Sequence, residues 1–195
     1  MLRGARDLLR EEGIAGFSMR KVAKRAGVTA TAIYRHYEDR DALVAAAVLQ
    51  GFRLFTRYLN DSLSADTPRA RLRASYFRYL DFAEEQREHY VLMFKTPRNI
   101  VDHSIFDEAA RGEMSATFAF LVARIEECQG DGTLPQQDAQ QAAMHAWASM
   151  HGLASLYIDC QLPPPGVSRR QLSEQHFSAI LAALTHPVTT DAALE

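Results

Sequence analysis

The 195-residue sequence has no apolar run approaching the roughly 20 residues that a membrane-spanning helix requires. Low-complexity segments are also absent. The first seven residues carry too much charge for the apolar core of a secretory signal peptide. These absences predict a cytoplasmic protein that does not contact a membrane.

Cysteine is scarce as well. Cys128 and Cys160 are the only two, and neither belongs to a Cys-x-x-Cys pair. The spacing argues against a disulfide framework or a metal site and predicts ordinary thiols in a reducing compartment. A redox-sensing thiol is the alternative that this pattern leaves open.

The sequence contains none of the common catalytic motifs. There is no Gly-x-Ser-x-Gly, His-Glu-x-x-His or glycine-rich phosphate loop, and no histidine has a glutamate three residues before it, as a di-iron bundle would need. Ser18-x-x-Lys21 has the spacing of some acyl-transfer enzymes, but no partner motif accompanies it. We expect no catalytic residues, no metal and no cofactor, with a helical enzyme as the remote alternative.

The formal net charge is −2, which taken alone argues against a nucleic-acid partner. The charge is unevenly distributed, however. Residues 1–50 contain nine Lys or Arg and six Asp or Glu, whereas residues 51–195 contain thirteen and eighteen. A basic N-terminal segment followed by an acidic remainder would present one face to phosphate and repel DNA elsewhere.

Apolar residues recur with the helical period along almost the whole chain, and no stretch alternates as a strand would. Glycines separate short helices near the N-terminus, and Asp66-Thr67-Pro68 and Ser168 are typical helix starts. The pattern predicts an all-α protein of about nine helices. The longer segments are expected at residues 40–63, 66–86, 89–95, 107–129, 136–160 and 169–184.

Residues 18–40 have the pattern of a helix-turn-helix. Ser18 is a good N-cap for a helix over residues 19–26, Gly27 suits a sharp turn with positive φ, and Thr29 can cap the second helix. The apolar residues expected to hold the second helix against the first are Val28 and Ile33. The basic residues around this motif are Arg20, Lys21, Lys24, Arg25, Arg35 and Arg40.

The N-terminal pattern resembles the TetR family of bacterial regulators over residues 2–47. The resemblance lies in Gly13-x-x-Gly16-Phe17-Ser18, Val22-Ala23-x-x-Ala26-Gly27-Val28 and Ile33-Tyr34-x-His36-Tyr37-x-x-Arg40-x-x-Leu43. Farther on, Trp147-x-x-x-His151-Gly152 resembles the W-x-x-x-H-G segment of one C-terminal subgroup. The resemblance implies a three-helix DNA-binding domain over residues 1–47 and a helical ligand-binding and dimerisation domain over residues 48–195.

Two departures from the family pattern affect DNA affinity. Arg40 stands where the family commonly has lysine, and this replacement keeps the phosphate contact. The chain also begins at the first expected helix, without the basic N-terminal arm of many members. We therefore expect Arg20, Arg35 and Arg40 to carry more of the affinity.

The resemblance also assigns roles to individual residues at the DNA. The residues expected to hold phosphates and fix the register are Ser18, Arg20, Tyr34, His36 and Arg40. Those expected to face base edges are Thr29, Ala30, Thr31 and Arg35. Arg35 is the candidate for a bidentate contact to guanine, and Ala30 or Thr31 for a thymine methyl group. The alternative is a packing role within the domain for Tyr34, Tyr37 and His36.

The rest of the chain is rich in aromatic and Met residues that could line an apolar ligand pocket. The candidates are Tyr76, Tyr79, Met93, Phe94, Phe106, Met114, Phe118, Met144, Trp147, His151 and Tyr157. Each could instead be an ordinary core residue. Trp147 and His151, one helical turn apart, are the best candidates for a shared pocket wall.

The last two long helices are expected to form a homodimer interface. Small residues that would let helices approach closely are Ala142, Ala146, Ser149 and Gly152. Taken together, the sequence and the resemblance predict a repressor that binds a palindromic double-stranded DNA operator as a homodimer. A small apolar or amphipathic effector would release it from DNA. A transcriptional activator or a ligand-independent DNA-binding protein of the same fold is the alternative.

Overall fold

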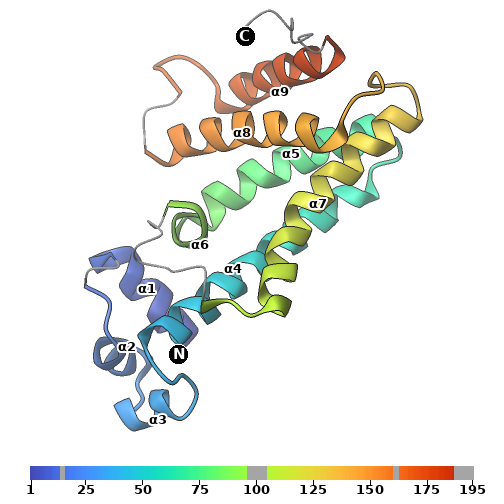
Figure 1. Cartoon of the computed structure of the whole chain (residues 1–195). Coiled ribbons are helices and arrows are strands. Elements are labelled where there is room, and N and C mark those ends of the chain that lie inside the picture. Colours follow the sequence, from blue (N-terminus) through green and yellow to red (C-terminus); the bar gives the residue numbers. More distant parts are fainter. Residues whose placement is uncertain (14–15, 96–104, 160–162, 187–195) are drawn as a thin grey trace, which may run out of the picture. The chain divides into compact units, whose positions relative to one another are not determined.

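The computed structural model describes residues 1–13, 16–95, 105–159 and 163–186, and all regular structure in these ranges is helical (Figure 1). The described residues contain nine α-helices and no strand, which confirms the predicted fold class. Across the described residues, no helix is both long and apolar enough to cross a membrane. They also contain no group of three or more potential metal ligands.

The chain divides into two compact units that are discontinuous in sequence. The first unit comprises Met1–Arg57 and Glu85–Thr117, and the second comprises Tyr58–Glu84 and Phe118–Glu195. The long helices α4 (Arg40–Asp61) and α7 (Glu108–Gly130) each contribute to both units. The predicted division of the sequence after residue 47 concerns function, and it stays a prediction.

The first unit contains the N-terminal helices. These are α1 (Leu2–Glu12), α2 (Met19–Ala26) and α3 (Ala30–Tyr34), followed by α4. Later in the chain, α6 (Arg87–Tyr90) continues directly into a π-helical turn, η2 (Val91–Lys95). Helix α1 packs against both α2 and α6. The core of this unit is apolar and includes Leu8, Val22, Ile33, Leu43 and Phe52.

The second unit contains the 3-10 turn η1 (Ser62–Ser64) and α5 (Pro68–Glu85), together with the C-terminal part of α7. It is completed by α8 (Ala139–Ile158) and α9 (Arg169–Thr185), which pack against each other. Its core includes Leu72, Tyr76, Ile125, Ala143 and Phe177.

The predicted helix boundaries agree with the structure to within a few residues because most starts are capped locally. Thr67 accepts a hydrogen bond from the backbone N–H of Ala70 at 3.2 Å, and Asp107 accepts from Ala110 at 2.7 Å. Ser168 caps α9 in the same way, by accepting from Gln171. The segment between the helices predicted at residues 89–95 and 107–129 lies largely outside the described residues, and so does Cys160.

Candidate nucleic-acid interface

Local hydrogen bonds build the turn between α2 and α3. The Ser18 hydroxyl accepts from the Lys21 N–H at 3.3 Å, and the Thr29 hydroxyl accepts from the Ala32 N–H at 3.1 Å. Between them, Gly27 has φ 68° and ψ 27°, which is the left-handed region. Its N–H donates to the Lys24 carbonyl, and the N–H of the next residue donates to the Ala23 carbonyl. This is the Schellman pattern that ends a helix, and it confirms the predicted turn. The two hydroxyl contacts confirm the predicted caps at Ser18 and Thr29.

Apolar contacts hold the two helices together. Ile33 is fully buried, and Val22 and Ala23 lie in the same core. Val28 and Tyr37 are half-buried against that core. The packing role considered for Tyr37 therefore fits its surroundings. Because the buried residues all point inward, the opposite side of α3 is left free for another molecule.

The predicted DNA-contacting residues differ in exposure. The exposed ones are Arg20, Thr29, Thr31, Arg35 and His36. Tyr34 is 54% exposed, so in this chain it does not serve the core. The remaining three, Ser18, Ala30 and Arg40, are half-buried.

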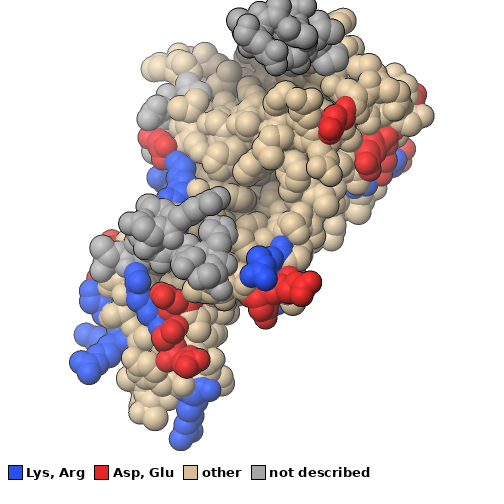
Figure 2. All heavy atoms as spheres, viewed as in Figure 1, with Lys and Arg blue, Asp and Glu red and all other residues tan. Residues whose placement is uncertain are grey.

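Internal ion pairs occupy some of the basic residues. Lys21 pairs with Glu12 of α1 and also donates to the Gly16 carbonyl, while Arg25 pairs with Glu11. The hydrogen bond to Glu11 raises the pKa of Arg25. Arg40 lies 3.8 Å from Asp41. At the lower left of Figure 2, Lys and Arg are interspersed with Asp and Glu.

No ion pair or side-chain hydrogen bond occurs for Arg20, Lys24 or Arg35 among the described residues. These three cations are therefore available to an external anion. Lys24 was not among the predicted contact residues, although it follows Arg20 by one helical turn. The i, i+4 spacing on α2 is the sequence signal that could have identified it.

The predicted pocket residues fall in both units. Four of them lie in the first unit, where Phe106 is buried in the core and Met93, Phe94 and Met114 are partly buried against it. The other seven lie in the second unit. There Tyr76, Tyr79 and Tyr157 are buried, whereas Met144 is 46% exposed. The pocket assignment of these eleven residues stays a prediction.

Four predicted pocket residues of the second unit are in mutual contact. The Trp147 ring lies 6.3 Å from that of Phe118 and 5.6 Å from that of His151, measured between ring centroids. The Tyr79 hydroxyl forms a 2.9 Å hydrogen bond with Nδ1 of His151. Helices α5, α7 and α8 thus contribute to one aromatic cluster that contains the predicted wall of Trp147 and His151.

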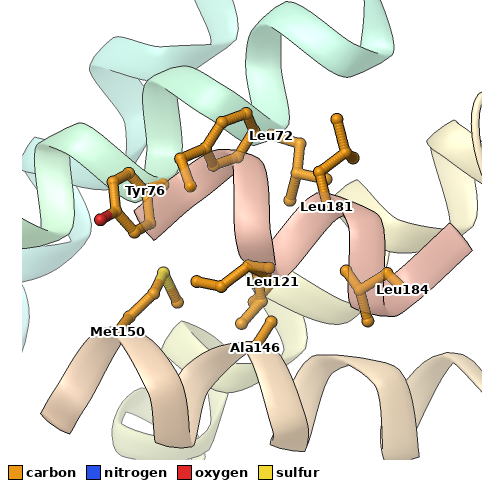
Figure 3. Close-up of a pocket in the computed structure, with 9 residues that line it drawn as sticks. Leu72, Tyr76, Leu121, Ala146, Met150, Leu181 and Leu184 are labelled. Atoms are coloured by element: carbon orange, nitrogen blue, oxygen red, sulfur yellow. The ribbon is translucent and has the colours of Figure 1, made fainter. Parts of the chain in front are cut away.

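A separate apolar space lies between α5, α7, α8 and α9 (Figure 3). It measures about 10 Å³, close to the lower limit for one water molecule and too little for an organic effector. Of the predicted pocket residues, Tyr76 alone lines it. The lining residues are Leu72, Tyr76, Leu121, Ala146, Met150, Phe177, Ile180, Leu181 and Leu184.

Polar contacts fasten α9 to its neighbours in the second unit. His176 of α9 forms hydrogen bonds through Nδ1 to the Tyr76 hydroxyl, at 2.8 Å, and through Nε2 to the Ser149 hydroxyl, at 2.9 Å. Burial lowers the pKa of His176 and raises that of Tyr76. Cys128 is also buried, and burial raises its pKa to about 11, which makes it a poor candidate for a redox-sensing thiolate.

Two family profiles match this chain. The profile of bacterial regulatory proteins of the tetR family matches residues 1–47, and that of the tetracyclin repressor-like C-terminal domain matches residues 72–184. No curated protein sequence is significantly similar to the chain. The predicted likeness to the W-x-x-x-H-G subgroup is not tested by these matches.

Solved structures share the fold over nearly the whole chain. A protein with unknown function from Rhodococcus sp. RHA1 has 27% sequence identity and a TM-score of 0.80, with 94% of this chain and 93% of that chain covered. The fatty acid degradation regulator FadR from Bacillus halodurans has 13% identity and a TM-score of 0.75, with coverage of 96% and 93%.

The TetR family transcriptional regulator PfmR from Thermus thermophilus has 17% identity and a TM-score of 0.68, with coverage of 93% and 96%. At such identities, FadR and PfmR show the shared fold alone. The C-terminal profile covers more than half of the chain, and the N-terminal profile covers the helix-turn-helix with its exposed Arg20 and Arg35. The chain therefore belongs to the TetR family of bacterial transcriptional regulators.

Proposed function

We propose that this regulator is a repressor that binds a palindromic operator as a homodimer and leaves it when a small apolar or amphipathic effector binds. The observation that carries the proposal is the exposed side of α3. It presents the exposed Thr31 and Arg35 beyond a helix start capped by Thr29. A planar guanidinium matches the two acceptors of guanine in the major groove.

Phosphate contacts are assigned to side chains on both sides of α3. Arg20 and Lys24 on α2 are exposed and have no ion-pair partner in the described ranges, and Arg40 begins α4. His36 and Tyr34 are exposed and can donate hydrogen bonds to phosphate oxygens. Such contacts hold the protein in register without reading sequence. The base edges are left to Thr29, Ala30, Thr31 and Arg35.

The proposed homodimer rests on the surfaces of α8 and α9. Helix α8 contains no Lys, Arg, Asp or Glu, although much of it is exposed in the single chain. Its exposed residues include Gln141, Met144, His145, Ala148, Gly152 and Leu156. Small exposed residues on α9 are Ser178, Ala179, Ala182 and Ala183. An uncharged surface of small and apolar residues is typical of a helix interface with a second copy.

Two of the small residues predicted to permit close helix approach have a different position. Ala142 and Ala146 are buried within their own chain, so they contribute to intramolecular packing. Gly152 is exposed, and nothing in its own chain lies within 4 Å of where a Cβ would be. We therefore place the contact between copies around Ala148 and Gly152.

The proposed effector site is the aromatic cluster of the second unit. Trp147, His151 and Phe118 are half-buried, so their rings are not fully occupied by the core. Together with the Tyr79–His151 hydrogen bond, they combine apolar surface with polar groups, as small-molecule sites do. We propose regulation rather than catalysis for this surface, in a cytoplasmic protein.

Selection of bound fragments from random duplex DNA tests the proposal with the full chain. We expect an enriched site with two-fold symmetry. Apolar and amphipathic compounds are then added to the bound duplex, and some should release it. An enriched site without symmetry would contradict the homodimer, and no enrichment would contradict sequence-specific binding. An activator or a ligand-independent DNA-binding protein is the second candidate, and it would give an enriched site with no compound causing release.

A further inference from the structure

His89 is an unusual residue in the core of the first unit. It lies on α6 and is only 2% exposed. Its Nδ1 atom is buried and has no hydrogen-bond partner within the part of the chain that the structure describes. Buried polar atoms are nearly always paired, because an unpaired one has lost its hydrogen bonds to water without replacement. His89 is not near the exposed side of α3, so DNA binding does not explain its presence.

Close packing surrounds the Nδ1 atom. A Cβ placed on Gly51 of α4 would lie 3.3 Å from Nδ1 of His89 and 2.6 Å from Sδ of Met93. Glycine at this position therefore allows α4 to approach α6 and η2 closely. Next to this contact, the ring of Phe94 lies 5.1 Å from that of Tyr90 and 5.9 Å from that of Phe52. Apolar groups thus leave little room for a compensating acceptor.

The charges that act on His89 come from two helices. Arg6 of α1, which pairs with Asp7, opposes a positive charge on the imidazole, and Glu88 of α6 favours it. Helix α4 and the turn η2 face the ring with the uncharged Gly51 and Met93. The pKa of His89 is lowered, mainly by burial and then by Arg6. The neutral ring is therefore the form that suits the folded unit.

A proton on His89 would affect the helices that bind DNA through α1. Helix α1 packs against α6 on one side and against α2 on another. It also holds α2 through the pairs of Glu11 with Arg25 and Glu12 with Lys21. The charged imidazole carries an N–H at both ring nitrogens, so its Nδ1–H has no acceptor at the contact of α6 with α4, and Arg6 opposes its charge. The charged form therefore favours separation of α6 from its neighbours.

We propose that His89 makes DNA binding by this protein acid-sensitive, because its protonation loosens the packing of α6 against α1 and α4 in the unit that carries the helix-turn-helix. The inference rests on the proposed DNA binding. The sign follows from linkage. A histidine whose pKa is lowered on folding stabilises the fold fully above about pH 6.5, and this contribution declines as the pH falls toward the folded-state value.

The test compares the wild type with His89→Phe and His89→Asn, neither of which titrates. Binding of the full chain to the selected duplex is measured at pH 7.5 and 5.5 and at fixed salt. Between the two pKa values, wild-type affinity should fall by up to about tenfold per pH unit. At least one variant should keep its pH 7.5 affinity at pH 5.5. His176→Gln is the matched control, since His176 also has a lowered pKa but lies in the second unit, and it should respond like the wild type.

Thermal unfolding over the same pH range separates this inference from the proposed DNA binding. The wild-type Tm should fall on acidification more than that of His89→Phe or His89→Asn, whether or not a DNA site has been identified. If both folded variants lose affinity and Tm on acidification as the wild type does, the inference is overturned. A wild type with unchanged affinity and Tm at pH 5.5 would overturn it as well.

Discussion

Arg35 and Arg40 are five residues apart, and their surroundings differ. Arg35 follows directly after α3, is exposed and has no partner among the described side chains. Arg40 begins α4, is half-buried and lies 3.8 Å from Asp41. We assign the first to base edges and the second to phosphate.

Replacing Arg35 by alanine should weaken operator binding by about 1–3 kcal/mol for each half-site and relax the base preference at one position of each half-site. The reason is that the methyl group of alanine cannot replace a bidentate contact to guanine. Binding to the selected duplex and to its single-base variants measures both effects. Unchanged affinity together with unchanged preference would show that Arg35 does not read a base.

Arg40→Ala should weaken binding to all sequences alike. Loss of one phosphate contact in each copy of the proposed homodimer releases about two counterions fewer, so the slope of log K against log salt should become shallower by about 1.8. Affinities at several salt concentrations measure this slope for the selected duplex and a scrambled one. If only the selected duplex were affected, Arg40 would be a base reader.

At the scale of the elements, most helices follow from local signals. The caps at Ser18, Thr29, Thr67 and Ser168 act over three residues, which is why the predicted starts agree with the structure. The segment predicted as one short helix over residues 89–95 is instead α6 followed by the π-helical turn η2. A π turn depends on the packing around it, here against Gly51 and Phe52, and local signals do not report that packing.

Gly27→Ala tests the turn between α2 and α3. An L-residue at φ 68° is strained, so this change should destabilise the protein by about 1–2 kcal/mol and weaken DNA binding. Gly112→Ala in α7 is the matched control. Gly112 lies inside a helix, with no positive φ and nothing within 4 Å of a Cβ, so alanine should stabilise by about 0.5–1 kcal/mol. Urea unfolding of both variants measures the difference, and equal effects would contradict the assigned turn.

At the scale of the whole molecule, the sequence has a basic N-terminal segment and an acidic remainder. The compact units of the structure do not coincide with these two segments, because residues 85–117 belong to the same unit as the N-terminal helices. A residue far along the chain, His89, therefore lies in the core that supports the helix-turn-helix. Contacts between segments so distant in sequence leave no periodic signal.

Gly152→Arg should convert the proposed dimer to a monomer. The new side chain meets nothing in its own chain, but it would place a desolvated, unpaired charge between two copies. Sedimentation velocity should show half the mass, and operator affinity should fall because the two half-sites are no longer bound together. Ala116→Arg, at an exposed position of α7, is the matched control and should stay dimeric. A dimeric Gly152→Arg variant would exclude the interface around this residue.

The sequence by itself determined the all-α fold, the helix-turn-helix with its caps and turn glycine, and the surplus of basic residues around it. These features depend on interactions within a few residues, so their signals are local. Only the tertiary structure decided that Lys21 and Arg25 pair with α1 while Arg20, Lys24 and Arg35 stay free of partners among the described residues. It alone revealed the unpaired Nδ1 of His89 beside Gly51, because burial and partnership depend on which distant helices meet.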